Sequence, residues 1–209
     1  MKDVRVFFRK TGDLKFISHL DMNRFFIRLL RKSGLNVWYT EGFNPHPYIT
    51  FALPLSLGFE SDCEAVDFKL LDDTDYSVVF EKISEIVPKG IEVLKVVEPK
   101  YKSGKIAFAV YELTFENEKE FESFLEFLNA ETVIVSKKTK SGAVKVSDIK
   151  GKFAYKANGN LSLLIKLPCG NENINPQSIV NSFCEQNELQ IYVSYKRISL
   201  LVDDNTIFE

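Results

Sequence analysis

Cysteine and histidine are scarce in this chain of 209 residues, which has three cysteines and two histidines. The cysteines, Cys63, Cys169 and Cys184, are odd in number and far apart. This usage is typical of free thiols in a reducing cytoplasm rather than of a disulfide framework. Because no Cys-x-x-Cys pair is present, the sequence predicts neither a zinc knuckle nor an iron–sulfur cluster.

Long apolar runs are also absent, and none approaches the roughly 18 residues that a membrane-spanning helix needs. The first residues, MKDVRVFFRK, contain no apolar signal region, so we expect no export signal. A hydrophobic content of 45% and a charged content of 27% are those of an ordinary globular protein. The sequence therefore predicts a cytoplasmic protein with one large domain or two small ones.

The net charge of −2 conceals an asymmetry along the chain. Residues 1–60 carry nine Lys and Arg against five Asp and Glu, whereas the remainder carries 18 against 24. The overall balance argues against a general polyanion binder, but the first quarter allows a local anion site. Alternatively, the positive end docks on the acidic remainder of the same chain.

Hydrophobic periodicity in the first half predicts six elements in the order β-α-β-β-α-β, the ferredoxin-like pattern. Residues 48–57 are also strand-like, and they form either an added strand or the bulged first half of the third strand. The predicted strands span 4–10, 36–40, 63–71 and 91–97, and the predicted helices span about 19–32 and 75–88.

The pattern recurs after a polar linker at 99–105, so we predict an N-terminal domain over 1–98 and a C-terminal domain over 106–209. One interpretation of the basic segment 137–150 is a hairpin. The expected fold class is α+β, with two tandem ferredoxin-like halves and antiparallel sheets. The predicted strands are 106–116, 132–137, 152–167 and 189–202, and the predicted helices are 118–129 and 175–187, the latter with Asn175 as N-cap and Pro176 at its first position.

The first helix has clear local signals. Ser18 is a candidate N-cap with Asp21 as its capping-box partner, and Ser33-Gly34 is a candidate C-cap. One helix face is apolar, and the other carries a basic row that is either a solvated face or a binding stripe. The basic row consists of Arg24, Arg28, Arg31 and Lys32.

Topology predicts that the loop after the first strand and the loop after the second lie at the same end of the sheet. The first loop leads to His19 and the second carries His46, the only two histidines. Both would then share a surface beside a helix N-terminus, where exposed amide groups favour an anion. The plainer alternatives are that Ser18 and Asp21 only cap the helix and that His19 is a buried structural residue.

Three chemistries fit the side chains expected there. His19 or His46 could be a general acid or base in RNA cleavage. A metal could be held by His19, Asp21, Glu41 and His46. RNA or another phosphate-rich ligand could be bound by cationic, polar and aromatic side chains, which are Arg9, Lys10, Lys15, Ser18, Arg24, Arg28, Arg31, Trp38, Tyr39, Phe43 and Asn44.

All of these residues except Trp38 lie in two segments, VRVFFRKTGDLKFISHLDMNRFFIRLLRKSGL and YTEGFNPHPYITFALPLSLGFESDCEAVDFKL. By these two segments the chain resembles the radical-SAM-linked bacterial domain of unknown function. Asn36 departs from the Pro that similar sequences often place there. The resemblance implies a bacterial cytoplasmic protein in RNA or ribosome metabolism, as a stand-alone radical SAM-associated protein. This chain has no Cys-x-x-x-Cys-x-x-Cys run, so it is not expected to hold the radical SAM cluster, and such chemistry would need a separate radical SAM protein.

The sequence thus favours an RNA-binding or substrate-presenting accessory. One alternative is an RNA-acting enzyme, either endoribonuclease-like or modifying, that uses His19 or His46. Tandem ferredoxin-like halves also occur in CRISPR repeat-processing endoribonucleases, a likeness of architecture only. The other alternative is a small-ligand or metal-binding protein. No cofactor is expected in the chain beyond such a metal, and the oligomeric state stays open.

Overall fold

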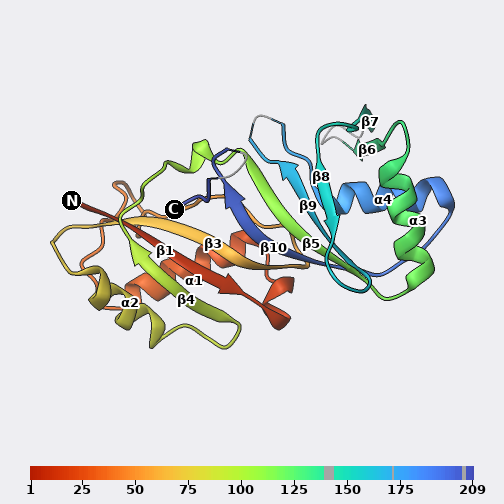
Figure 1. The fold of residues 1–209 in the computed structure, drawn as a ribbon. Helices are drawn as coiled ribbons and strands as arrows, with labels where there is room; N and C mark the ends of the chain where they lie inside the picture. The colour runs from red at the N-terminus through yellow and green to blue at the C-terminus, as the bar shows by residue number, and fades with distance from the viewer. Residues whose placement is uncertain (139–143, 171, 204–205) are drawn as a thin grey trace. The chain divides into compact units, whose positions relative to one another are not determined.

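The computed structural model describes residues 1–138, 144–170, 172–203 and 206–209 (Figure 1). In these residues the fold is mixed α+β, with mainly antiparallel strands and four α-helices. The chain divides into two compact units, which are unit 1 (Met1–Ile106 with Ile207–Glu209) and unit 2 (Ala107–Thr206). Within the described ranges, no helix is long and apolar enough to cross a membrane.

In unit 1 the strand β1 lies between β4 and β3 and is antiparallel to both, while the short β2 pairs with β3. Val6 of β1 faces Val66 of β3 on one side and Val96 of β4 on the other. The elements are β1 (Lys2–Lys10), η1 (Gly12–Phe16), α1 (His19–Lys32), β2 (Thr50–Phe51), β3 (Phe59–Leu70), α2 (Tyr76–Ser84), β4 (Ile91–Val97) and η2 (Ser103–Lys105).

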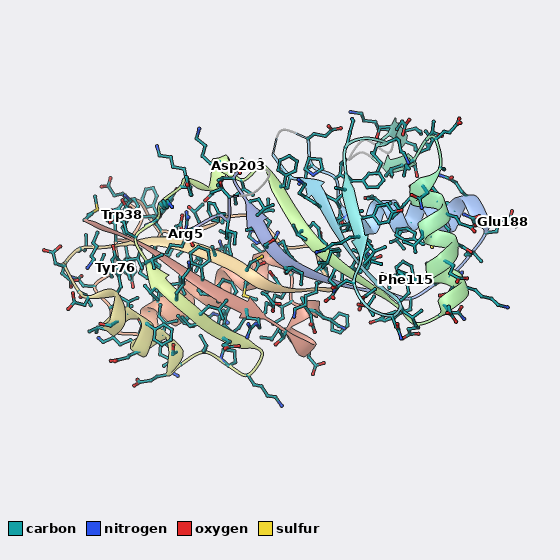
Figure 2. All side chains as sticks on the ribbon, viewed as in Figure 1. Arg5, Trp38, Tyr76, Phe115, Glu188 and Asp203 are labelled. Carbon is teal, nitrogen blue, oxygen red and sulfur yellow. The ribbon has the colours of Figure 1, made fainter. Side chains whose placement is uncertain are left out.

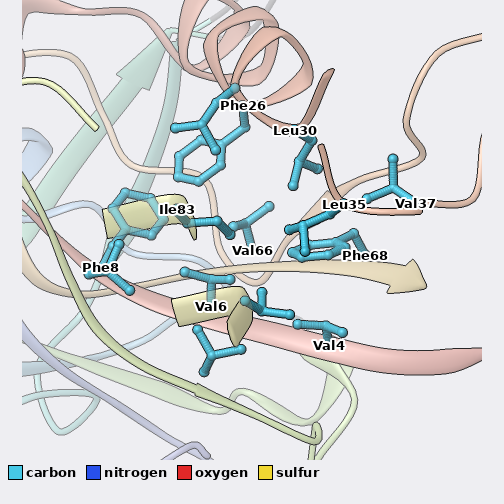
Figure 3. Close-up of a cluster of buried hydrophobic side chains, with 14 of the residues drawn as sticks. Val4, Val6, Phe8, Phe26, Leu30, Leu35, Val37, Val66, Phe68 and Ile83 are labelled. Atoms are coloured by element: carbon cyan, nitrogen blue, oxygen red, sulfur yellow. The ribbon is translucent and has the colours of Figure 1, made fainter. Parts of the chain in front are cut away.

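The core of unit 1 lies between one face of this sheet and the helices α1 and α2 (Figure 3). Val4, Val6 and Phe8 alternate along β1 and point to the helices, where Phe26 of α1 and Ile83 of α2 are also buried. Burying a side chain of this size stabilises the fold by about 1.5–3 kcal/mol. This packing fixes α1 along the sheet and so determines where its exposed face lies.

The second strand of unit 1 is interrupted. Val37 bridges to Leu70 of β3, and Thr50 pairs with Asp67. If the pairing of Val37 with Leu70 continued without interruption, residue 40 would lie opposite Asp67. Thr50 lies there instead, so ten extra residues are inserted before the strand resumes its pairing with β3. The predicted strand 36–40 is therefore present only as isolated bridges, and of the strand-like stretch 48–57 only β2 is a strand.

In unit 2 the strands lie in the order β10, β5, β9, β8, and each is antiparallel to its neighbour. The strand β7 lies in the basic segment 137–150 and pairs with β6, which ends at the start of that segment. Residues 139–143, the middle of the hairpin that the sequence suggests, lie outside the described residues. The elements are β5 (Phe108–Phe115), α3 (Glu118–Asn129), β6 (Ile134–Lys138), β7 (Val144–Asp148), β8 (Ala154–Ala157), β9 (Ser162–Pro168), α4 (Pro176–Asn187) and β10 (Val193–Leu201).

The helix signals in the sequence are confirmed at α1, α3 and α4. The predicted bounds of α1 and α3 are those observed. Asn175 caps α4 by accepting a hydrogen bond from the amide of Gln177, and Pro176 is the first helical residue. The predicted helix 75–88 is shorter, because α2 ends at Ser84.

Candidate nucleic-acid interface

The N-terminus of α1 is capped as its sequence predicts. The hydroxyl oxygen of Ser18 accepts a hydrogen bond from the amide of Asp21 at 3.1 Å and donates one to the Asp21 carboxylate at 2.7 Å. Arg24 also binds this carboxylate, at 3.1 Å. These hydrogen bonds, that from Ser18 foremost, hold the pKa of Asp21 below its ordinary value. The capping role predicted for Ser18 is confirmed, and Asp21 is engaged by both neighbours.

His19 lies beside a small cavity at this end of α1. Its exposed ring packs edge-on against Phe51, with centroids 5.1 Å apart. The cavity is also lined by Lys10 and Glu64, two charged residues that are almost completely buried, and it holds about 10 Å³. Such a volume has room for about one water molecule. Lys10 donates from Nζ to the carbonyl oxygen of Ile17 at 3.2 Å.

His46 lies in a different place, in the loop that interrupts the second strand. Its Nδ1 is 3.0 Å from the carbonyl oxygen of Asn44, which can only accept, so Nδ1 carries the proton in this contact. The same nitrogen is 3.2 Å from the hydroxyl of Thr40, and the Thr40 amide donates to the His46 carbonyl at 2.8 Å. The imidazole of His46 thus closes its own loop.

The two histidines do not share a surface, so the prediction that their loops meet at one rim is wrong. Arg31, in the last turn of α1, donates to the carbonyl oxygen of Pro45 at 3.0 Å, whereas His19 is the first residue of α1. The twelve positions between His19 and Arg31 span about 18 Å of helix. The physical reason is that the loop with His46 leaves the second strand at Tyr39, near the start of that strand, and not at the end of the strand.

The proposed metal ligands are dispersed in the same way. His19 and Asp21 lie at the first turn of α1, while Glu41 and His46 belong to the loop beside its last turn. Among the residues that the structure describes, no group of three or more His, Cys, Asp and Glu side chains is placed to hold a metal ion. The metal-binding interpretation of these four residues therefore lacks a shared geometry.

Two of the predicted cationic ligands are engaged elsewhere. Arg9 alternates with Phe8 and Lys10 along β1 and so lies on the sheet face that points away from α1. It forms ion pairs with Asp62, at 2.9 Å, and with Glu92. Lys15 lies in η1, and its ammonium is 5.2 Å from the ring centroid of Phe16.

The exposed basic row of α1 meets the loop that carries His46 at one end, the last turn of the helix. Arg24, Arg28 and Arg31 are all exposed, and Arg31 makes the contact with Pro45. The predicted anion ligands that the structure brings together are therefore those of the helix face and of the loop.

The loop itself presents aromatic rings. Phe43 is fully exposed at its tip, and Tyr39 and Tyr48 at its base are 38% and 46% exposed. The rings of Trp38 and Tyr48 meet edge-on with centroids 5.3 Å apart. Trp38 lies at the end of unit 1 where β1 begins (Figure 2), in agreement with its hydrogen bond to Lys69 near the end of β3.

Sequence reasoning missed the buried charges of unit 1. Glu64 is not among the predicted site residues, and Lys10 is predicted at the surface, yet both line the cavity beside His19. The signal was present in the alternation of β1, because Lys10 follows Val4, Val6 and Phe8 at even positions and so points to the core.

These features define an α+β protein with a basic helix face and an aromatic loop side by side. Residues 3–176 match the family described as uncharacterized protein conserved in bacteria (DUF2344), and the chain belongs to this family. No curated protein shows significant similarity to it.

Two solved structures resemble the chain distantly. A crystal structure of an unknown protein from Galdieria sulphuraria is 12% identical, over 94% of this chain and 98% of that one, with a TM-score of 0.28. An X-ray structure of a heavy metal efflux pump, crystal form II, is 9% identical, with a TM-score of 0.26. The match covers 94% of this chain but 28% of the pump. At such TM-scores, function has to be argued from the chain itself.

Proposed function

We propose that unit 1 binds RNA and that the protein is an RNA-binding or substrate-presenting accessory. The observation that carries this proposal is the hydrogen bond from Arg31 to Pro45, which ties the arginine face of α1 to the loop with Phe43 at its tip. Arginine suits phosphate oxygens because its planar guanidinium can donate several hydrogen bonds at once. An exposed aromatic ring offers a face on which a base can stack.

We further propose that the two units form a duplicated scaffold for this function, each of them a ferredoxin-like half. In unit 1 the order β4, β1, β3 with β2 on β3, and in unit 2 the order β10, β5, β9, β8, follow the same plan. In both, the first strand of the unit leads to an α-helix, from β1 through η1 to α1 in unit 1 and from β5 to α3 in unit 2. The resemblance to radical-SAM-linked proteins supports a separate radical SAM protein as the partner to which bound RNA would be presented.

A binding experiment tests the proposal. We expect the protein to bind a fluorescein-labelled RNA pool in an anisotropy titration, with an affinity that falls as salt rises. Replacing Arg24 and Arg28 by Gln should weaken binding and reduce the slope of log affinity against log salt by about 1.4, if each arginine neutralises one phosphate of a single strand. Both side chains are exposed, so the double variant should fold as the parent does.

The matched control removes two positive charges from unit 2. Lys119 and Lys156 are exposed, and replacing both by Gln changes the net charge equally. We expect the control to bind RNA as tightly as the parent. Unchanged binding in the Arg24 and Arg28 variant at the same salt, or equal losses in both variants, would contradict a binding face on α1.

A second function, an RNA-acting enzyme, has one observation in its favour. The exposed His19 lies beside buried Lys10 and Glu64, and histidine is the side chain that most often serves as a general acid or base. His46 belongs to another surface, so only His19→Ala should abolish turnover. If the purified protein leaves a broad RNA pool unchanged, with and without divalent metal ions, the enzyme hypothesis fails while the binding proposal stands.

A further inference from the structure

We infer that residues 41–47, hereafter the Phe43 loop, are a stacking platform for unpaired bases, so that the RNA bound by unit 1 is single-stranded. This inference rests on the proposed function and names its substrate class. It is carried by three properties of the loop, which are its rigidity, its exposed rings and its place beside α1.

The Phe43 loop is held in one conformation by several bonds. Tyr39 bridges to Pro47, and the amide of Tyr48 donates to the carbonyl of Trp38 at 3.2 Å, which closes the base of the loop. His46 fastens the loop internally, and Arg31 fastens it to α1. A platform held in this way loses little conformational entropy when a ligand binds.

Phe43 occupies the tip of this rigid support and is fully exposed. Exposed phenylalanine gains nothing for the fold, because the hydrophobic effect favours its burial. Tyr39 and Tyr48 add partly exposed rings at the base of the loop. Because Tyr39 pairs with Pro47, the residue before Tyr48, the two tyrosine rings lie on opposite faces of this pair. The loop thus offers ring faces at its tip and on both flanks.

The surroundings favour nucleic acid over a protein partner. The loop contains Gly42, Asn44 and Pro45 beside Phe43 but no aliphatic side chain, so the loop itself presents a ring among polar and small residues and not an aliphatic patch. The neighbouring helix face supplies Arg28 and Arg31 for the phosphate backbone. Stacked bases in a duplex cannot reach an isolated ring, whereas unpaired bases can.

Glu41 opposes this assignment, because its exposed carboxylate would repel phosphate. The net charge of the helix face and loop is nevertheless positive, since four cationic side chains outnumber Glu41 and the Asp21 carboxylate that pairs with Arg24. The four are Arg24, Arg28, Arg31 and Lys32. Glu41→Gln should therefore tighten RNA binding.

The test compares single-stranded RNA of roughly 12 nucleotides with the same strand annealed to its complement, by fluorescence anisotropy at one salt concentration. We expect the single strand to bind at least about tenfold more tightly. Phe43→Ala should weaken single-strand binding by about tenfold and leave duplex binding nearly unchanged. Phe43→Trp should retain binding, and Phe43→Leu should not, because it keeps the apolar area without a ring.

Phe16→Ala is the matched control, since Phe16 is another largely exposed phenylalanine of unit 1 that is not in the loop. Equal binding of duplex and single strand, or full binding by Phe43→Ala or Phe43→Leu, would overturn the inference. If RNA binding still depended on Arg24 and Arg28 in that case, the proposed function would stand. Binding of neither RNA would refute the proposed function itself. A Phe43 variant that loses a protein partner but not RNA would assign the loop to protein recognition.

Discussion

Arg5 and Asp67 lie directly opposite each other on β1 and β3, and their side chains form a two-point ion pair. The distances are 2.7 Å from Nε to Oδ1 and 2.8 Å from Nη2 to Oδ2. The side chain of Arg5 is completely buried, and it also donates to the carbonyl oxygen of Glu209 at 3.0 Å and lies over the ring of Phe208. A buried guanidinium thus joins two strands to the last residues of the chain.

Removing Asp67 should destabilise the protein strongly, because it leaves the buried charge of Arg5 without its carboxylate. We expect Asp67→Ala to lower the free energy of unfolding by about 3–5 kcal/mol, measured by urea denaturation. The double variant Arg5→Met, Asp67→Leu should be closer to wild type, since it removes both charges. The partly exposed pair of Arg9 and Asp62 is the control, and Asp62→Ala should cost less than Asp67→Ala, because Arg9 keeps access to solvent when its partner is removed. Equal unfolding midpoints for both single variants would contradict the prediction.

Ser18→Ala should have two effects at the start of α1. Loss of the N-cap should destabilise the protein by about 1 kcal/mol. The pKa of Asp21 should rise towards its ordinary value, because the Ser18 hydroxyl is the largest cause of its depression. The stabilisation linked to this carboxylate is present above its unfolded-state pKa and is lost as pH falls through the folded one.

An NMR titration of the Asp21 carboxyl carbon measures this pKa in both proteins. Arg24→Gln, which removes a hydrogen bond and a positive charge from this carboxylate, should also raise the pKa. An unchanged Asp21 pKa in Ser18→Ala would show that the hydroxyl does not stabilise the carboxylate.

Gly90→Ala should destabilise unit 1 both by straining the backbone at residue 90 and by bringing the new Cβ too close to a neighbouring atom. Gly90 has φ of +95°, and an added Cβ would lie 2.9 Å from the carbonyl oxygen of Thr11. The left-handed backbone alone costs about 1–2 kcal/mol, which corresponds to a fall in melting temperature of roughly 2–8 °C. Gly42→Ala has a positive φ but open space around it, so it should cost less than Gly90→Ala. Gly104→Ala, with neither strain nor contact, should be nearly neutral.

Cys169 should be the least reactive thiol of unit 2. Burial raises its pKa to about 11, whereas a free thiol titrates near 9.0. The thiolate is the reactive form, so alkylation of Cys169 by iodoacetamide should be slow at pH 8 and should quicken as pH approaches that pKa. Mass spectrometry of peptides from the alkylated native protein gives the rates. Faster labelling of Cys169 than of the less buried Cys184 at pH 8 would contradict this prediction.

The helices could be predicted because their signals are local. Ser18 before an apolar stripe marks the start of α1, and Asn175-Pro176 marks that of α4. The strand topology was harder, because the second strand of unit 1 breaks at Tyr39 and resumes at Thr50. Nothing in the alternation of residues 36–51 distinguishes an interrupted strand from two strands. The expected meeting of His19 and His46 depended on that difference.

The candidate site could be predicted from the sequence only in part, because it too depends on where the loop leaves the second strand. The arginine face of α1 follows from helical periodicity, but its contact with Pro45 depends on where the loop leaves the sheet. The burial of Lys10 and Glu64 is a tertiary effect, since charged residues are mostly exposed unless other groups compensate them.

The loop with Phe43 leaves its strand and returns ten residues later without any change of register. Excising residues 40–49 would join Tyr39 to Thr50 with every cross-strand partner of β3 retained. Length and composition at this position can therefore drift through evolution, or be exchanged by grafting, while the supporting sheet keeps its pairing. Ligand preference and scaffold integrity are separable traits in such an arrangement.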